Sequence, residues 1–136
     1  MPANTSPIYP LTPNCGERNV VITAANTDKT GAGAVLLFTA GANGSRFDKI
    51  KSKPLGTCVA TVLRIFLNNG GSVGTPANNS LIGEVSLPAT TISEVLAQVE
   101  MEWLGDTAMQ AGYKIYLAQG TAVVAGWVHS GFGGDY

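Results

Sequence analysis

The chain has 136 residues and a formal net charge of −1, and 45% of its residues are hydrophobic while only 12% are charged. This balance excludes an intrinsically disordered chain, and it supplies no basic field that would draw the protein onto nucleic acid or an anionic membrane. The length is sufficient for one domain with a real core but not for two.

Glycine occurs 17 times, which is typical of short strands joined by frequent turns. No run approaches the roughly eighteen apolar residues that a membrane-crossing helix needs. The first residues have neither a basic start nor an apolar central region, so we expect no secretory signal peptide. Release from a cell is then expected to occur by lysis or by assembly into a particle.

Residues 1–18 are rich in proline, which fixes φ and removes a backbone donor. We predict an extended N-terminal arm over residues 1–18 that lies on its own domain or on a neighbour, and a single domain over residues 19–136. Ile8, Tyr9 and Leu11 are the apolar anchors of the arm in this interpretation. Simple fraying of the chain end is the alternative interpretation.

From Asn19 onward, the apolar residues recur with a period of two, which predicts strands. The segment 55–68 is apolar on both faces, so we expect it at the centre of a sheet or between layers. The absence of strand–helix–strand alternation and the close spacing of turns predict an all-β protein, an antiparallel β-sandwich of the jelly-roll type. The predicted strands cover residues 19–24, 34–40, 46–53, 55–68 and 80–87, followed by a hairpin-like pair at 112–120 and 121–131.

Residues 90–106 fit two patterns. Ile92, Val95, Leu96 and Val99 match the spacing of an amphipathic helix, with Thr91 as a possible N-cap. The alternation of apolar residues with glutamates up to position 103 matches a half-buried strand at least as well. Five consecutive alternations favour the strand.

The stretch FTAGANGSRFDKIKSKPLG, residues 38–56, concentrates glycines and basic residues. It lacks the G-x-x-x-x-G-K-[ST] run that opens a phosphate-binding helix. Asn43-Gly44 instead predicts a tight hairpin turn, because such turns need positive φ. The turn is expected to lead into an exposed basic strand.

In that strand, Phe47 and the three lysines are predicted to share one face, with the ammonium groups roughly 7 Å apart. A solvated row that protects a sheet edge from mispairing is one interpretation. Contact with the acidic surface of a partner protein is another, whereas nucleic-acid binding is disfavoured because aromatic residues are not interleaved. The residues of this basic ladder are Arg46, Lys49, Lys51 and Lys53.

No motif predicts catalysis, a cofactor or a metal site. Glu100 and Glu102 are expected on a solvated strand face, and His129 is the only histidine, without a recognisable nucleophile motif. Cys15 and Cys58 fit no zinc spacing, so they are expected to be buried or half-buried thiols, with a disulfide as the alternative. The two tryptophans are expected in the core or an interface rather than in a sugar-binding platform.

Three stretches resemble small structural proteins of tailed bacteriophages, namely the capsid decoration or cement proteins. These stretches cover residues 24–57, 63–71 and 111–136, and their most specific pieces are TAGANGSR and the terminal GGDY. The proline-rich start and residues 90–106 depart from the resemblance.

The resemblance implies a homotrimer that binds the major capsid protein on the outer face of a phage head, after synthesis in the host cytoplasm. It implies no enzyme activity, no cofactor, no nucleic acid and no membrane. The arm would reach a neighbouring subunit, and the basic ladder would meet acidic capsid surface. A head fibre, a minor tail component or a glycan-binding adhesion module is the alternative.

Overall fold

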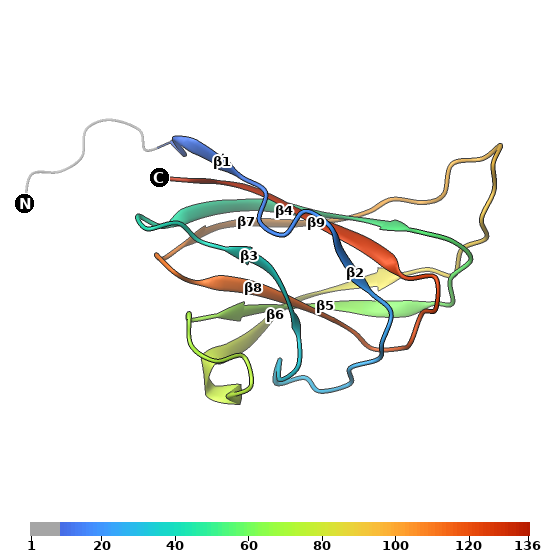
Figure 1. The fold of residues 1–136 in the computed structure, drawn as a ribbon, viewed down its shortest axis with the longest axis horizontal. Coiled ribbons are helices and arrows are strands. Elements are labelled where there is room, and N and C mark those ends of the chain that lie inside the picture. Colours follow the sequence, from blue (N-terminus) through green and yellow to red (C-terminus); the bar gives the residue numbers. More distant parts are fainter. Residues whose placement is uncertain (1–8) are drawn as a thin grey trace, which may run out of the picture.

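The computed structural model describes residues 9–136, which form two antiparallel β-sheets packed face to face (Figure 1). The predicted all-β sandwich is therefore confirmed. Within the described residues the elements are β1 (Thr12–Asn14), β2 (Val20–Ile22), β3 (Val35–Thr39), β4 (Ser45–Pro54), β5 (Thr61–Asn68), the 3-10 helix η1 (Pro76–Asn78), β6 (Asn79–Leu87), β7 (Met101–Met109), β8 (Lys114–Gln119) and β9 (Trp127–Asp135).

The two sheets divide the strands without regard to chain order. One sheet has the order β1–β9–β4–β7, and β2 also pairs with β9. The other has the order β3–β8–β5–β6. Strand β9 pairs with β4 on one side, while its other side pairs with β2 at residues 127–129 and with β1 at residues 133–135. Ile8 lies outside the described residues, but β1 shows that residues 12–14 of the predicted arm lie on their own domain.

The main core lies between the two sheets and is filled by large apolar side chains. Phe38 of β3 and Phe47 of β4 meet with ring centroids 4.9 Å apart in an edge-to-face arrangement, a geometry that aromatic pairs favour. Trp127 of β9 and Ile65 of β5 are fully buried in the same cluster. Each strand contributes alternate residues, because successive side chains of a strand point to opposite faces.

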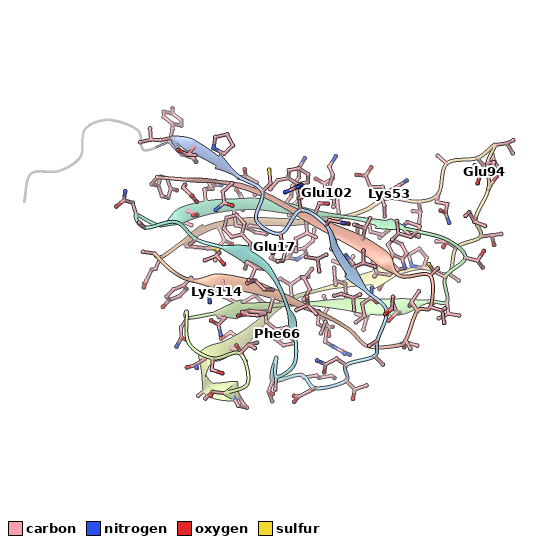
Figure 2. The ribbon with its side chains drawn as sticks, in the orientation of Figure 1. Glu17, Lys53, Phe66, Glu94, Glu102 and Lys114 are labelled. Carbon is pink, nitrogen blue, oxygen red and sulfur yellow. The ribbon has the colours of Figure 1, made fainter. Side chains whose placement is uncertain are left out.

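A second, smaller cluster lies on the other face of the β3–β8–β5–β6 sheet. Phe66 of β5 is fully buried there and packs with Tyr116 and Ala118 of β8 (Figure 2). Val73, from the loop between β5 and β6, packs against this cluster. Strand β5 is thus apolar on both faces and lies between β8 and β6, as its sequence predicted.

Two predicted hairpins are wrong, because consecutive strands cross between the sheets. Residues 112–131 do not form a pair, since β8 belongs to one sheet and β9 to the other. The turn at Asn43-Gly44 likewise connects β3 to β4 in the opposite sheet. Gly44 does have φ of +87°, so the expectation of positive φ is confirmed, but the turn is a corner of the sandwich and not a hairpin.

Strand β4 also differs from its predicted role. The register shifts between Phe47 and Lys49, so the bulge at Asp48 moves Phe47 onto the buried face with Ile50, opposite the lysines. The strand lies between β9 and β7. It is therefore an interior strand and not the exposed sheet edge that the lysine row suggested.

Residues 90–106 are only partly a strand. Residues 91–99 form neither helix nor strand, and β7 begins at Met101 and continues to Met109. Thr90 makes an isolated bridge with Cys58. The alternating pattern around Val95 therefore belongs to a projecting loop, because no neighbouring strand is available to pair with it.

Candidate functional site

The basic ladder of β4 faces an acidic ladder formed by Glu102 of β7 and by Glu100, which immediately precedes β7. Lys49 Nζ lies 3.5 Å from Glu102 Oε1, and Lys51 Nζ lies 3.4 Å from Glu100 Oε1. Both pairs join β4 to the neighbouring segment on the outer face of the sheet. All four side chains keep about 36–47% of their surface exposed, so these are solvated pairs of small individual energy.

Arg46 and Lys53, at the two ends of the basic ladder, also have partners within the chain. Arg46 forms an ion pair with Asp106 of β7, and its Nε lies 3.5 Å from Asp48 Oδ1. Lys53 Nζ donates a hydrogen bond of 2.7 Å to the backbone oxygen of Gln98. The cations predicted to form a contact site thus lie together on one face, but each already has a partner within the chain. This face is a neutral strip of alternating charge.

The N-terminal segment leaves the domain beside the C-terminus. The backbone nitrogen of Leu11 donates to the oxygen of Asp135 at 2.7 Å, and β1 pairs with β9 through Thr12 and Asp135. The side chains of Tyr9 and Leu11 remain 70% and 84% exposed. Two of the three predicted anchors are therefore uncovered apolar side chains at the base of the arm.

Asp135 joins three distant segments at this point. Its carboxylate accepts hydrogen bonds from the Ser45 hydroxyl and from Asn14 Nδ2, the latter at 2.9 Å. Asn14 Nδ2 also reaches the oxygen of Thr39 at 3.0 Å. These bonds, first from Ser45 and then from Asn14, hold the pKa of Asp135 below its ordinary value. The turn after β3, the arm and the C-terminal strand are thereby fixed to one another.

This cluster unites the two most specific pieces of the phage resemblance. Ser45 belongs to TAGANGSR, and Asp135 belongs to the terminal GGDY. The backbone nitrogen of Tyr136 also donates to the oxygen of Gly44 at 3.2 Å. Sequence reasoning named both pieces but could not place them together, because neither carries a signal of its contact with the other.

His129 lies inside the sandwich and not in a cleft. It is fully buried, and its Nδ1 lies 2.7 Å from the Ser52 hydroxyl, while its Nε2 lies 3.2 Å from Gln119 Nε2. The ring thus shares one hydrogen bond with the Ser52 hydroxyl and one with the Gln119 side-chain amide.

The Ser52–His129–Gln119 group is therefore a polar bridge between the sheets. Ser52 and His129 belong to β4 and β9, whereas Gln119 belongs to β8 of the opposite sheet. Burial lowers the pKa of His129 to about 4, because desolvation disfavours the imidazolium. The ring is neutral at physiological pH.

The remaining sequence candidates are dispersed. Trp127 is fully buried, and Trp103 packs closely over Gly83, where an added Cβ would meet its indole nitrogen at 2.6 Å. Cys15 is exposed and Cys58 is buried, and both are free thiols, so the expected burial is wrong for Cys15. Within residues 9–136, no group of three or more His, Cys, Asp or Glu side chains could hold a metal ion.

Sequence reasoning missed the exposed surface of the loop between β6 and β7. This loop encloses a hollow of about 420 Å³ lined by Ile92, Leu96 and Val99, among others. A second hollow of about 360 Å³ lies beside Asn26 and Asp28. The alternation of Val95 and its neighbours was visible in the sequence, but it was interpreted as a strand and not as exposed surface.

In the part of the chain that the structure describes, no helix is long and apolar enough to cross a membrane. No protein-family model, curated protein or solved structure matches this chain.

Proposed function

We propose that the protein is a capsid decoration protein, which binds as a homotrimer to the outer face of a tailed-phage head and stabilises the shell. The observation that carries the proposal is the cluster at Asp135. It brings together the two pieces of sequence on which the phage resemblance mainly rests, and it fixes the base of the N-terminal arm.

The proposed contact with the shell is made by apolar side chains of the arm. The side chains of Tyr9 and Leu11 are largely exposed, and full burial of a leucine side chain is worth about 1.5–3 kcal/mol. Because β1 is paired with β9, Tyr9 and Leu11 lie next to a fixed strand beside the C-terminus. Less conformational entropy is then lost when the arm binds.

The mechanism is linkage between binding and shell stability. A protein that binds the mature shell but not its dissociated subunits stabilises the shell by mass action. Several weak contacts in one oligomer raise the effective affinity, provided that they can be made at the same time. Neither effect needs a catalytic group.

The basic ladder contributes less to this proposal than its sequence suggested. Lys49 and Lys51 face Glu102 and Glu100, so an acidic capsid surface would have to compete with glutamates that are already in place. Contact through this face would be screened by salt. We therefore assign the shell contact to the arm.

The alternative of glycan binding has weaker support. A sugar-stacking platform needs an exposed aromatic face, but Trp127 is fully buried and Trp103 packs between Phe47 and Gly83. The alternatives of a head fibre or a minor tail component share the sandwich and the arm. Binding to heads separates them from decoration.

The test is co-sedimentation of the purified protein with expanded phage heads that lack it. We expect saturable binding and an increased resistance of the heads to heat. A variant lacking residues 1–11 should bind at least about tenfold more weakly, because it loses Tyr9 and Leu11. This variant keeps Asn14 and its bonds to Asp135 and Thr39, so it should remain folded.

The matched control is Lys49→Ala, which removes a ladder cation and leaves the arm intact. It should bind heads like the wild type. If the full-length protein does not bind heads, the decoration function is wrong. If the truncated protein binds as tightly as the full chain, only the role of the arm is wrong.

A further inference from the structure

The end of the sandwich opposite β1 and the C-terminus is formed by three loops, residues 55–60, 88–99 and 120–126. Figure 1 shows these loops together at one end and β1 with the C-terminus at the other. The three loops are called the apolar end below.

Exposed aliphatic side chains are concentrated at the apolar end. Of the fourteen large hydrophobic residues that are exposed within residues 9–136, seven lie in these loops. Val124 is 97% exposed, Val95 is 89% exposed and Leu96 is 72% exposed. The complete set is Leu55, Val59, Ile92, Val95, Leu96, Val99 and Val124.

The loops are held in place by hydrogen bonds. Gln98 Nε2 donates to the oxygen of Gly56 at 2.8 Å, and the backbone nitrogen of Ile92 donates to the Thr57 hydroxyl at 3.2 Å. The backbone nitrogen of Leu55 donates to the oxygen of Gly126 at 3.0 Å, which ties the first loop to the third. The exposed side chains are therefore carried on a bonded framework, so that little ordering is needed when they bind.

The apolar end is almost without charge. Glu94, near the tip of the longest loop, is the only charged residue in the three loops (Figure 2). Association with a lipid surface relies on basic residues around an apolar face, and association with nucleic acid relies on a basic surface. The chemistry of this end therefore fits another uncharged, apolar protein surface.

We infer that the apolar end is the contact between copies of this chain, with the loops of neighbouring subunits packed against one another. The same surface on a second copy is uncharged and apolar in the same way. This inference rests on the homotrimer of the proposed function. The arm leaves from the opposite end, so contact with the shell and contact between subunits would not compete for one surface.

The exposed area is sufficient for such a contact. The seven side chains together expose the equivalent of roughly four to five complete side chains, or about 300–550 Å² of apolar surface. A standard interface buries about 800 Å² on each partner, of which about 450–520 Å² is apolar. The apolar patch is thus comparable with the apolar part of one side of a standard interface, and its size is that of the largest patch on a typical monomer, which is often functional.

The test compares substitutions of equally exposed residues inside and outside the apolar end. Leu96 in the apolar end and Leu104 on the outer face of β7 are both 72% exposed. We would measure the molar mass of the full-length wild type, Leu96→Lys, Val124→Lys and Leu104→Lys by light scattering and sedimentation over a range of concentrations. Circular dichroism and the melting temperature would check that each variant is folded.

We expect an oligomeric wild type, an at least tenfold weaker association for Leu96→Lys and Val124→Lys, and no change for Leu104→Lys. A monomeric wild type, or an equal effect of Leu96→Lys and Leu104→Lys, would overturn the inference. Head binding is measured separately. A monomer that still co-sediments with heads would therefore disprove the self-contact without disproving the decoration function.

Discussion

His129 illustrates how one buried side chain couples the stability of the sandwich to pH. Its ring is enclosed between Ser52 and Gln119, and burial lowers its pKa to about 4. In the unfolded chain the pKa returns to about 6.5. Over the interval between these values, the unfolded state binds a proton that the folded state does not bind.

We therefore predict that the contribution of His129 to the free energy of unfolding falls as the pH is lowered from 6.5 to 4 and is fully lost below pH 4, where the carboxylate of Asp135, whose pKa is lowered, begins to lose its own contribution. The full loss is about 3 kcal/mol, since each unit of pKa difference is worth about 1.4 kcal/mol. Urea unfolding at a series of pH values measures it. The variant His129→Gln should have an almost flat profile over this interval, and an unchanged slope in that variant would contradict the assignment.

Asp106 is the only described residue other than glycine that has positive φ, at 44°. It lies at the bulge of β7, where it pairs with Arg46. The left-handed conformation is unfavourable for residues with a Cβ, although aspartate tolerates it better than most. The ion pair is exposed and contributes little.

Glycine should consequently replace Asp106 at small cost. We expect Asp106→Gly to remain within about 0.5 kcal/mol of the wild type, since relief of backbone strain offsets the lost ion pair. Asp106→Ala loses the same pair without that relief, so it should be less stable than Asp106→Gly by roughly 0.5–1 kcal/mol. Thermal unfolding of the three proteins measures the difference. Equal stability of the two variants would show that the backbone at this position is not strained.

At the scale of elements, the paired ladders of β4 and β7 hold an edge strand on the sheet. Strand β7 has no strand on its other side within the described residues, and its bulge at Asp106 interrupts that free edge. Bulges and charged side chains are common means of preventing edge strands from pairing with other molecules. The ladders therefore have a structural use whether or not they contact a partner.

A double-mutant cycle on Lys49 and Glu102 should reveal a small favourable coupling. We expect Lys49→Glu and Glu102→Lys each to destabilise the protein, because each places like charges opposite one another. The double variant restores opposite charges between positions 49 and 102 and so recovers part of the stability, while the lysine introduced at position 102 still lies opposite Lys51. The coupling should be on the order of 0.5 kcal/mol and should decrease at high salt. Strictly additive effects would mean that the pair does not interact in solution.

The strand segments were largely predictable because alternation is a local signal. Residues 34–40 and 80–87 correspond closely to β3 and β6. Strand β1 was missed because Pro13 argued against a strand, although proline is tolerated at a sheet edge. The strand expected within residues 90–106 was displaced, because Val95 and its neighbours alternate correctly but have no partner strand.

Pairing between strands was not predictable from alternation. A period of two shows which face of a strand is buried, but it does not show which strand lies beside it. The crossings at residues 40–44 and 120–126 were therefore mistaken for hairpins. For the same reason, Lys49 and Glu102 were each placed on a solvated face, but their mutual contact depends on a register that the sequence does not contain.

For the whole molecule, the sandwich separates its two unusual surfaces. The arm and the Asp135 cluster lie at one end, and the apolar end lies at the other. A subunit arranged in this way can contact its neighbours and a supporting surface through different residues. Stability resides in the core between them, where Phe38, Phe47 and Trp127 are buried.

The pairing of β1 with β9 also makes the protein suitable for circular permutation. Because Thr12 lies opposite Asp135, a short glycine-rich linker could join the C-terminus to the start of β1 and leave the sheet order unchanged. New ends could then be opened in the exposed loop at residues 69–75, which connects β5 to β6. Such a circular permutant would lack residues 1–11 and would carry a fused peptide away from the apolar end, which would make the protein a scaffold for display.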